Sequence, residues 1–203
     1  CDVVVASRTE STLRSAAAEL ASVTGRMVTP ITVDTGDDDS VRAMVAGAVD
    51  AMGGVEILVH SAAKPAGQST PPKLAEITAA AFWDDMNVKV LGYLRCAQAV
   101  APHMRAAGWG RIINISGLGA RSTGSAIGSM RNVAVSAMTK NLADELGPAG
   151  INVTVVHPGL TRTEATQGVV ANLAATRGIS EDDAAAMLVR NSIGRLVDAT
   201  EVA

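Results

Sequence analysis

Five short apolar segments recur along this chain of 203 residues, and stretches with helical periodicity separate them. They lie at about 3–6, 27–33, 55–59, 111–115 and 150–156. Uninterrupted apolar runs of this length are typical of strands that are covered on both faces of a parallel sheet. Parallel strands need long crossover connections, which are usually helices. The alternation therefore predicts an α/β fold, with one doubly wound parallel sheet in a single domain over residues 1–203.

The helical segment between the second and third predicted strands shows the periodicity most clearly. We expect Asp38 or Ser40 to cap its first turn, and the pair Gly53 and Gly54 to end it. A longer helical stretch covers about 79–106. Pro30, in the second predicted strand, favours an edge position because proline has no N–H to donate. The apolar residues of the helical segment between the second and third predicted strands recur at three- and four-residue spacing, namely Val41, Met44, Val45, Ala48, Val49 and Met52.

Composition and charge exclude several classes of protein. Lys and Arg number 17 against 20 Asp and Glu, a formal net charge of −3 that argues against nucleic-acid binding through phosphate neutralisation. Apolar residues make up 48% of the chain, which is enough for a sizeable core. No apolar window approaches about 18 residues, so we expect no membrane span. Two cysteines and three scattered histidines predict neither a disulfide framework nor a metal site, and the expected location is cytoplasmic.

Four segments, in order along the chain, resemble the short-chain dehydrogenase/reductase family. Residues 59–63 are similar to the family's strand-end Asn-Asn-Ala-Gly segment, and residues 82–88 contain Asn87, which matches its helix asparagine. Residues 110–116 resemble the strand that leads to the catalytic serine. Residues 157–163 match the family's Pro-Gly-x-x-x-Thr loop.

The resemblance implies a Rossmann-like fold of seven parallel strands in the order 3-2-1-4-5-6-7, with a nicotinamide dinucleotide across their carboxyl ends. By this resemblance the sequence starts at strand two and stops before strand seven, so the domain is incomplete at both ends. It lacks the Gly-rich turn that brings backbone N–H groups to the pyrophosphate. Strands two and four would then have no common partner.

Cofactor preference is implied by the end of the first predicted strand. An acidic residue there would bind the adenosine ribose of NAD, whereas this chain has Ser7 and Arg8. A guanidinium suits a 2′-phosphate, so we expect NADP (NADPH) as the cofactor; the alternative is a solvated loop arginine. The resemblance adds further cofactor-binding residues, namely Asp34, Ser61, Ala62, Ala63, Pro158, Gly159, Thr161 and Thr163.

These further residues also have plainer interpretations. Asp34 would contact the adenine or lead the next helix. The small residues 61–63 would let the cofactor approach the backbone or would pack the strand end. Thr161 and Thr163 would hydrogen-bond the cofactor or cap the following helix.

The catalytic residues depart from the family pattern. The family uses a tyrosine as general acid and base, a lysine four residues later that lowers its pKa, a serine and a helix asparagine. In this chain Gly128 and Asn132 occupy the tyrosine and lysine positions. Ser116 and Asn87 remain as the expected catalytic residues, with Gly117 as the alternative alignment of the serine. The chain has one tyrosine, Tyr93, for which packing or a subunit contact is expected.

Four other side chains are candidates to replace the tyrosine hydroxyl as proton donor or charge stabiliser, and each also has a plainer structural interpretation. Arg131 would stabilise a developing alkoxide or lie on a helix surface. His60 and His157 end strands and titrate near neutrality, or serve as structural histidines. Lys64, in a loop rich in Pro, Gly and Ser, would reach the mouth of the site or remain solvated.

Two functions from different classes follow. The first is an NADP-dependent oxidoreductase that transfers a hydride between nicotinamide and a carbonyl or alcohol substrate, with a non-standard proton donor. The second is a catalytically silent family member that binds a nucleotide or a partner. The resemblance also implies a homo-dimer or homo-tetramer formed through the helices at about 79–106 and 129–146, and a substrate lid in residues 164–190.

Overall fold

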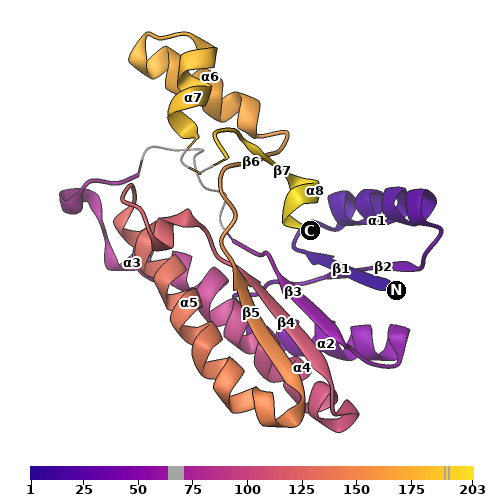
Figure 1. Cartoon of the computed structure of the whole chain (residues 1–203). Coiled ribbons are helices and arrows are strands. Elements are labelled where there is room, and N and C mark those ends of the chain that lie inside the picture. Colours follow the sequence, from indigo (N-terminus) through magenta and orange to yellow (C-terminus); the bar gives the residue numbers. More distant parts are fainter. Residues whose placement is uncertain (64–70, 190, 192) are drawn as a thin grey trace.

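Parallel strands and helices alternate along the chain in a Rossmann-like α/β fold (Figure 1). The computed structural model describes residues 1–63, 71–189, 191 and 193–203. The first half comprises β1 (Val3–Ser7), α1 (Glu10–Thr24), β2 (Val28–Thr32), α2 (Asp38–Met52), β3 (Ile57–His60), η1 (Leu74–Glu76), α3 (Ala79–Met86), η2 (Asn87–Leu91) and α4 (Gly92–Ala107). The second half comprises β4 (Gly110–Ile115), η3 (Leu118–Ala120), α5 (Ala126–Leu146), η4 (Gly147–Ala149), β5 (Ile151–Val156), β6 (Thr161–Arg162), α6 (Thr166–Arg177), α7 (Glu181–Leu188), β7 (Val197–Asp198) and α8 (Ala199–Val202).

The strands form three separate parallel sheets, in the orders β1-β2, β3-β4-β5 and β6-β7. β1 and β3 do not pair, which matches the expectation that these two strands lack a common partner in this sequence. The side chains of Ile57 and Val59 in β3 are 53% and 55% exposed. Pro30 of β2 pairs with Val5 of β1. Because β1 is the only partner of β2 among the described strands, the edge position predicted for Pro30 is confirmed. The small β6-β7 sheet was missed, because two-residue strands leave no periodic pattern in a sequence.

One apolar core joins α2, α4 and α5 to β4 and β5. Its most deeply buried side chains include Val41 of α2, Val100 and Met104 of α4, Ile112 of β4 and Ile151 of β5. The periodic face predicted for α2 points into this core. The N-cap of α2 is neither Asp38 nor Ser40, as was predicted, but Asp37, whose side chain accepts the N–H of Ser40 at 2.7 Å.

The long helix predicted over 79–106 is interrupted by a π-helical turn, η2, between α3 and α4. A π turn inserts one extra residue per turn and is frequent at functional sites. Asn87 begins this turn, and Lys89 lies within it. The helix therefore changes which of its side chains face the sheet just where the sequence resembles the family's asparagine segment.

A buried polar chain crosses the middle of the sheet. The Nδ2 of Asn114 in β4 donates to Thr139 Oγ1 of α5 at 2.9 Å, which leaves Asn114 Oδ1 to accept the Nδ1–H of His60 at 2.7 Å. Burial lowers the pKa of His60 to about 4, and the bond from Asn114 acts in the opposite direction. His60 is therefore neutral at physiological pH, and this arrangement supports its interpretation as a structural histidine.

Replacing Asn114 with leucine should destabilise the fold by about 2–4 kcal/mol, because it leaves the buried His60 N–H without an acceptor. It also removes the bond that Thr139 accepts, although the Thr139 hydroxyl still donates to the Val135 carbonyl. Urea unfolding followed by circular dichroism measures this loss. Asn141→Leu on exposed α5 surface is the control, since its Nδ2 reaches only the Ala137 carbonyl of its own helix. Equal losses in the two variants would contradict the structural role of the chain.

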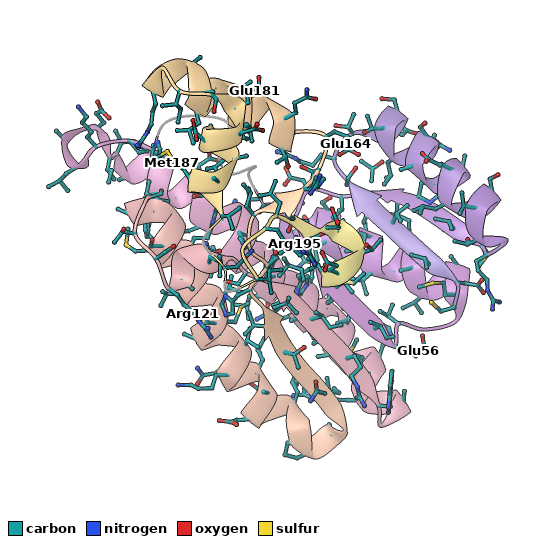
Figure 2. All side chains as sticks on the ribbon, turned by 45° about the horizontal axis from the view of Figure 1, so that its top comes forward. Glu56, Arg121, Glu164, Glu181, Met187 and Arg195 are labelled. Carbon is teal, nitrogen blue, oxygen red and sulfur yellow. The ribbon has the colours of Figure 1, made fainter. Side chains whose placement is uncertain are left out.

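The helices α6 and α7 form a hairpin that stands apart from the central sheet (Figure 1). They share a small core of their own, formed by Val170, Ala174 and Ala184. In Figure 2, Glu181 and Met187 mark this hairpin, and Glu56 lies at the amino end of β3 on the far side of the molecule. Among the described residues, no helix is both long enough and apolar enough to cross a membrane.

Candidate active site

The predicted cofactor residues all follow the carboxyl ends of strands. Ser7 ends β1, and Arg8 comes directly after it. Asp34 follows β2, residues 61–63 follow β3, and residues 158–163 follow β5. Ligands of open α/β folds bind at this edge, so the fold brings these segments to the expected side of the sheets.

The guanidinium of Arg8 is exposed and has no hydrogen bond or ion pair within the described part of the chain. Nearby arginines differ in this respect. Arg14 is paired with Glu10 at 2.7 Å, and Arg95 is paired with Asp38 at 2.5 Å. Arg8 is thus available to an anionic ligand at the end of β1.

The carboxylate of Asp34 is hydrogen-bonded within its own loop. Its Oδ1 accepts the N–H of Gly36 at 2.8 Å, and its own N–H donates to Ser40 Oγ in α2 at 2.9 Å. This geometry matches the interpretation of Asp34 as a residue that leads into a helix. Contact with an adenine remains a prediction.

The loop after β5 is held together by Thr166. Its hydroxyl donates to the Thr161 carbonyl at 3.1 Å and accepts the N–H of Thr163 at 2.8 Å. The N-cap of α6 is Ala165, so neither Thr161 nor Thr163 caps that helix. Pro158 and Gly159 are half-buried between β5 and this loop.

The small residues after β3 are at least partly exposed at the carboxyl end of that strand. Ser61 is exposed, and Ala62 and Ala63 are half-buried, so none of them fills the space beside the strand end with a large side chain. Their role toward a cofactor remains a prediction. Lys64, weighed as a residue at the mouth of the site, lies outside the described residues.

Ser116 lies immediately after β4 and is buried. Its Oγ donates to the Asn132 carbonyl at 3.1 Å, and its N–H donates to the Val156 carbonyl of β5 at 2.8 Å. The hydroxyl is therefore engaged with α5 in this structure. Its expected catalytic role is a prediction that the structure does not test.

Asn87 is hydrogen-bonded to the loop after β2. Its Nδ2 donates to the Gly36 carbonyl at 3.1 Å, and its own carbonyl accepts from Arg95. These bonds fasten the loop after β2 to the helix. The hydrogen bonds of Asn87 thus go to that loop and to Arg95, and its expected catalytic role remains a prediction.

The side chain of this segment that reaches Ser116 belongs to Lys89. Its Nζ donates to the Ser116 carbonyl at 3.0 Å and to Asn132 Oδ1 at 3.1 Å, and only 4% of the residue is exposed. Lys89 was not predicted as a site residue from the sequence. The available signal was a lone cation in the apolar run 88–91, which a solvated helix surface does not explain.

Burial is the main reason why the pKa of Lys89 falls to about 8. The guanidinium of Arg131 lowers it further, and the carboxylate of Asp85 acts in the opposite direction. Arg131 and Asp85 pair at 2.5 Å, and both side chains are largely buried. Arg131 is therefore neither a surface charge nor a free alkoxide stabiliser, because Asp85 already engages it.

Glycines surround the amide of Asn132. A Cβ at Gly117 would lie 3.3 Å from Asn132 Nδ2, and one at Gly119 would lie 2.9 Å from the same atom. Gly128 is one helical turn before Asn132, and a Cβ there would meet the Ser125 hydroxyl, which caps α5, at 3.1 Å. A side chain at 119 would force Asn132 to shift, and one at 117 would crowd it, so both glycines fit the position of the asparagine.

The only tyrosine is unavailable as an acid. Tyr93 is 1% exposed, its hydroxyl donates to the Ile115 carbonyl at 3.0 Å, and its ring stacks on His60. Burial raises the pKa of Tyr93 well above its ordinary value. Packing, the expected role, is what the structure shows. His157 bonds through Nδ1 to the Gly117 carbonyl at 3.2 Å and is half-buried.

No group of three or more metal-ligating side chains occurs in residues 1–63, 71–189, 191 and 193–203. The residues described above instead form a site in which Lys89 lies beside a serine, an asparagine and three glycines. Arg131 is buried nearby but is paired with Asp85. Their arrangement can donate hydrogen bonds to an oxygen-bearing ligand at the carboxyl edge of β4.

Comparisons with known proteins agree with this fold. The profile of the family described as short chain dehydrogenase matches residues 1–174. The short-chain reductase protein NovJ of Streptomyces niveus is 32% identical over 203 residues, 99% of this chain and 74% of NovJ. An uncharacterized oxidoreductase of Mycobacterium tuberculosis is 37% identical over 68% of this chain, which is 55% of its own length.

Solved structures extend the likeness. A variant of actinorhodin polyketide ketoreductase with NADPH shares 29% identity and a TM-score of 0.87, over 98% of this chain and 76% of that one. L-sorbose reductase from Gluconobacter frateurii, complexed with NADPH and L-sorbose, has a TM-score of 0.86 at 24% identity and supports the fold alone, over 97% of this chain and 75% of that one. The match of the family profile to most of the chain, together with these relatives, shows that the chain belongs to the short-chain dehydrogenase family of oxidoreductases.

Proposed function

We propose that this protein is an NADPH-dependent reductase of a small carbonyl compound. It would also catalyse the reverse reaction, in which the corresponding alcohol is oxidised by NADP. The observation that carries the cofactor choice is the unpaired, exposed guanidinium of Arg8 at the carboxyl end of β1. A planar cation there suits a 2′-phosphate and leaves the 2′-hydroxyl of NADH without an acidic partner. The NADPH named with the polyketide ketoreductase structure supports the same choice.

The cofactor residues that follow β3 and β5 fit the nicotinamide end of a dinucleotide. Residues 61–63 have small side chains that allow close approach to the backbone. Thr166 braces the loop 158–163 near the strand ends, where the hydroxyls of Thr161 and Thr163 make long bonds of 3.3 Å within the loop that a ligand would replace. Bound NADPH would supply the hydride for the substrate carbon. Positioning that carbon and handling the substrate oxygen fall to the residues around Ser116, Lys89 and Asn132.

Titration of the full-length protein with NADPH and NADH tests this function. We expect micromolar binding of NADPH, seen as a change in nucleotide fluorescence, and at least about tenfold weaker binding of NADH. Oxidation of NADPH at 340 nm with 2,3-butanedione or L-sorbose as the carbonyl probe should then follow. Absence of binding to both nucleotides would reject the proposal.

A second function has its own support. The engaged hydroxyls of Tyr93 and Ser116, together with glycine at position 128, favour a catalytically silent family member that binds a nucleotide or a partner. Tight NADPH binding without turnover of any carbonyl or alcohol would favour this second function over the first.

We also propose that the protein forms a homo-dimer or homo-tetramer through its long helices. Large apolar side chains are exposed on α3, η2 and α5, which is a pattern that self-association would cover. Their exposed fractions are 61% for Trp83, 38% for Leu91, 47% for Met130 and 51% for Val133.

A further inference from the structure

The lysine and the asparagine of this site lie on the opposite elements from those that the family pattern implies. The family resemblance implies an asparagine from the helix near residue 87 and a lysine from position 132 in α5. The structure instead joins a lysine of the first segment, Lys89, to an asparagine at the second, Asn132, through a bond of 3.1 Å. The same pair of side-chain chemistries is therefore present beside Ser116, but the cation reaches the site from the π-helical turn η2.

The ammonium of Lys89 is held in a fixed position by hydrogen bonds as well as being buried. Two of its three protons are donated, to the Ser116 carbonyl and to Asn132 Oδ1, which fixes Nζ at the carboxyl end of β4. The third proton has no hydrogen-bond acceptor within the described residues, although Nζ lies 6.0 Å from the centre of the Tyr93 ring. A cation held by two neutral acceptors and left with one free proton is arranged to donate that proton to a ligand.

The neighbourhood of Lys89 contains no better acid among the described side chains. Tyr93 is engaged with Ile115, and the Ser116 hydroxyl is engaged with Asn132. Arg131 is paired with Asp85, and a guanidinium does not release a proton in proteins. The titratable and charged groups around Lys89 are Asp85 from α3, Tyr93 from α4, Arg131 from α5, His60 from β3 behind Tyr93, and His157 after β5.

We propose that Lys89 is the catalytic acid of this protein, donating its free proton to the substrate oxygen while Asn132 and the Ser116 carbonyl hold the ammonium in place. The proposal rests on the proposed reductase function. In the reduction, the hydride with its electron pair goes to the carbonyl carbon. A new O–H bond forms as one N–H bond of Lys89 breaks, leaving a neutral amine that regains a proton from water. In alcohol oxidation the neutral amine accepts the hydroxyl proton.

The burial-lowered pKa of Lys89, about 8, gives this role a pH signature. Reduction needs the ammonium, which predominates below that pH, so the rate of hydride transfer should fall as pH rises through about 8. Alcohol oxidation needs the neutral amine and should rise over the same range. A general acid of this kind contributes about 10²–10⁴-fold to the rate.

The test uses the full-length protein, Lys89→Met, Lys89→Arg and the control Lys140→Met, which removes an exposed lysine of α5. Single-turnover oxidation of NADPH with 2,3-butanedione is followed from pH 6 to 10. We expect Lys89→Met to be at least about 100-fold slower at pH 7, with NADPH affinity within about threefold of the native protein. Lys89→Arg should be equally slow, because it keeps the charge but not the transferable proton. Lys140→Met should match the native protein.

A measurement without turnover accompanies the kinetics. In NMR of protein labelled at the lysine side chains, the resonance that disappears in Lys89→Met should titrate near pH 8 in the native protein. A titration near 10.4, the ordinary value for lysine, would overturn the proposal, as would a native rate independent of pH or full rescue by arginine. If native protein binds NADPH and turns over while Lys89→Met is unimpaired, only this proposal falls. If native protein binds no NADPH, the reductase function falls with it.

Discussion

Replacing Gly150 with alanine should destabilise the protein by about 3–5 kcal/mol and lower its melting temperature by about 10 °C. Gly150 has φ +77°, a conformation that costs an L-residue about 1–2 kcal/mol. A Cβ at this position would also overlap the backbone carbonyl of Gly108, where the chain leaving α4 passes the start of β5. Backbone cannot move aside there without disturbing the pairing of Gly110 with Ile151.

Gly25→Ala separates the two contributions to this loss. Gly25 ends α1 with φ +65°, but an added Cβ there has no neighbour within 4 Å. It should therefore show the conformational cost alone, about 1–2 kcal/mol. Calorimetric melting of both variants measures the difference, and equal losses would mean that the Gly108 contact carries no cost.

Replacing Arg8 with alanine should weaken NADPH binding by about 10- to 100-fold and leave NADH binding within about threefold. The reason is the loss of a charge-assisted contact with the 2′-phosphate, which is worth about 1.5–3 kcal/mol. NADH has no such phosphate and loses nothing specific. Fluorescence titration of each variant with both nucleotides gives the four dissociation constants needed.

Arg14→Ala is the matched control for charge. It removes one positive charge from α1, a few residues from Arg8, but its guanidinium is already paired with Glu10. Its NADPH affinity should stay close to that of the native protein. Equal weakening of NADPH and NADH in Arg8→Ala would show that Arg8 supports the nucleotide site in general and does not choose between the two.

The strands and the main helices could be predicted because apolar period and turn residues are local properties. The periodic face of α2 lies in the core, and all five predicted strands are present. The strands do not form one continuous sheet, since the β1-β2 and β3-β4-β5 groups are separate. The N-cap predicted for α2 was wrong, because neighbouring aspartates offer nearly equal capping oxygens.

The site was harder to predict because one π turn decides which side chains face it. The family resemblance favoured Asn87 as a catalytic residue. In the structure Lys89, which lies in η2, donates to the Ser116 carbonyl, whereas Asn87 donates to the Gly36 carbonyl. The engagement of Asn132 by Lys89 depends on two segments 43 residues apart. No local pattern encodes such a contact, although the lone lysine among apolar neighbours did mark a side chain that needed a buried partner.

The α6-α7 hairpin has a consequence for how such a protein diversifies. Val170, Ala174 and Ala184 pack against one another in a small core that is separate from the main core around β4 and β5. Weakly coupled units of this kind open and close with free energies below that of global unfolding. Substitutions on the outer faces of the hairpin can therefore accumulate at little cost to the scaffold. The segment that the family uses to cover its substrates is free to drift in sequence, while the strand ends that would hold the nucleotide stay fixed.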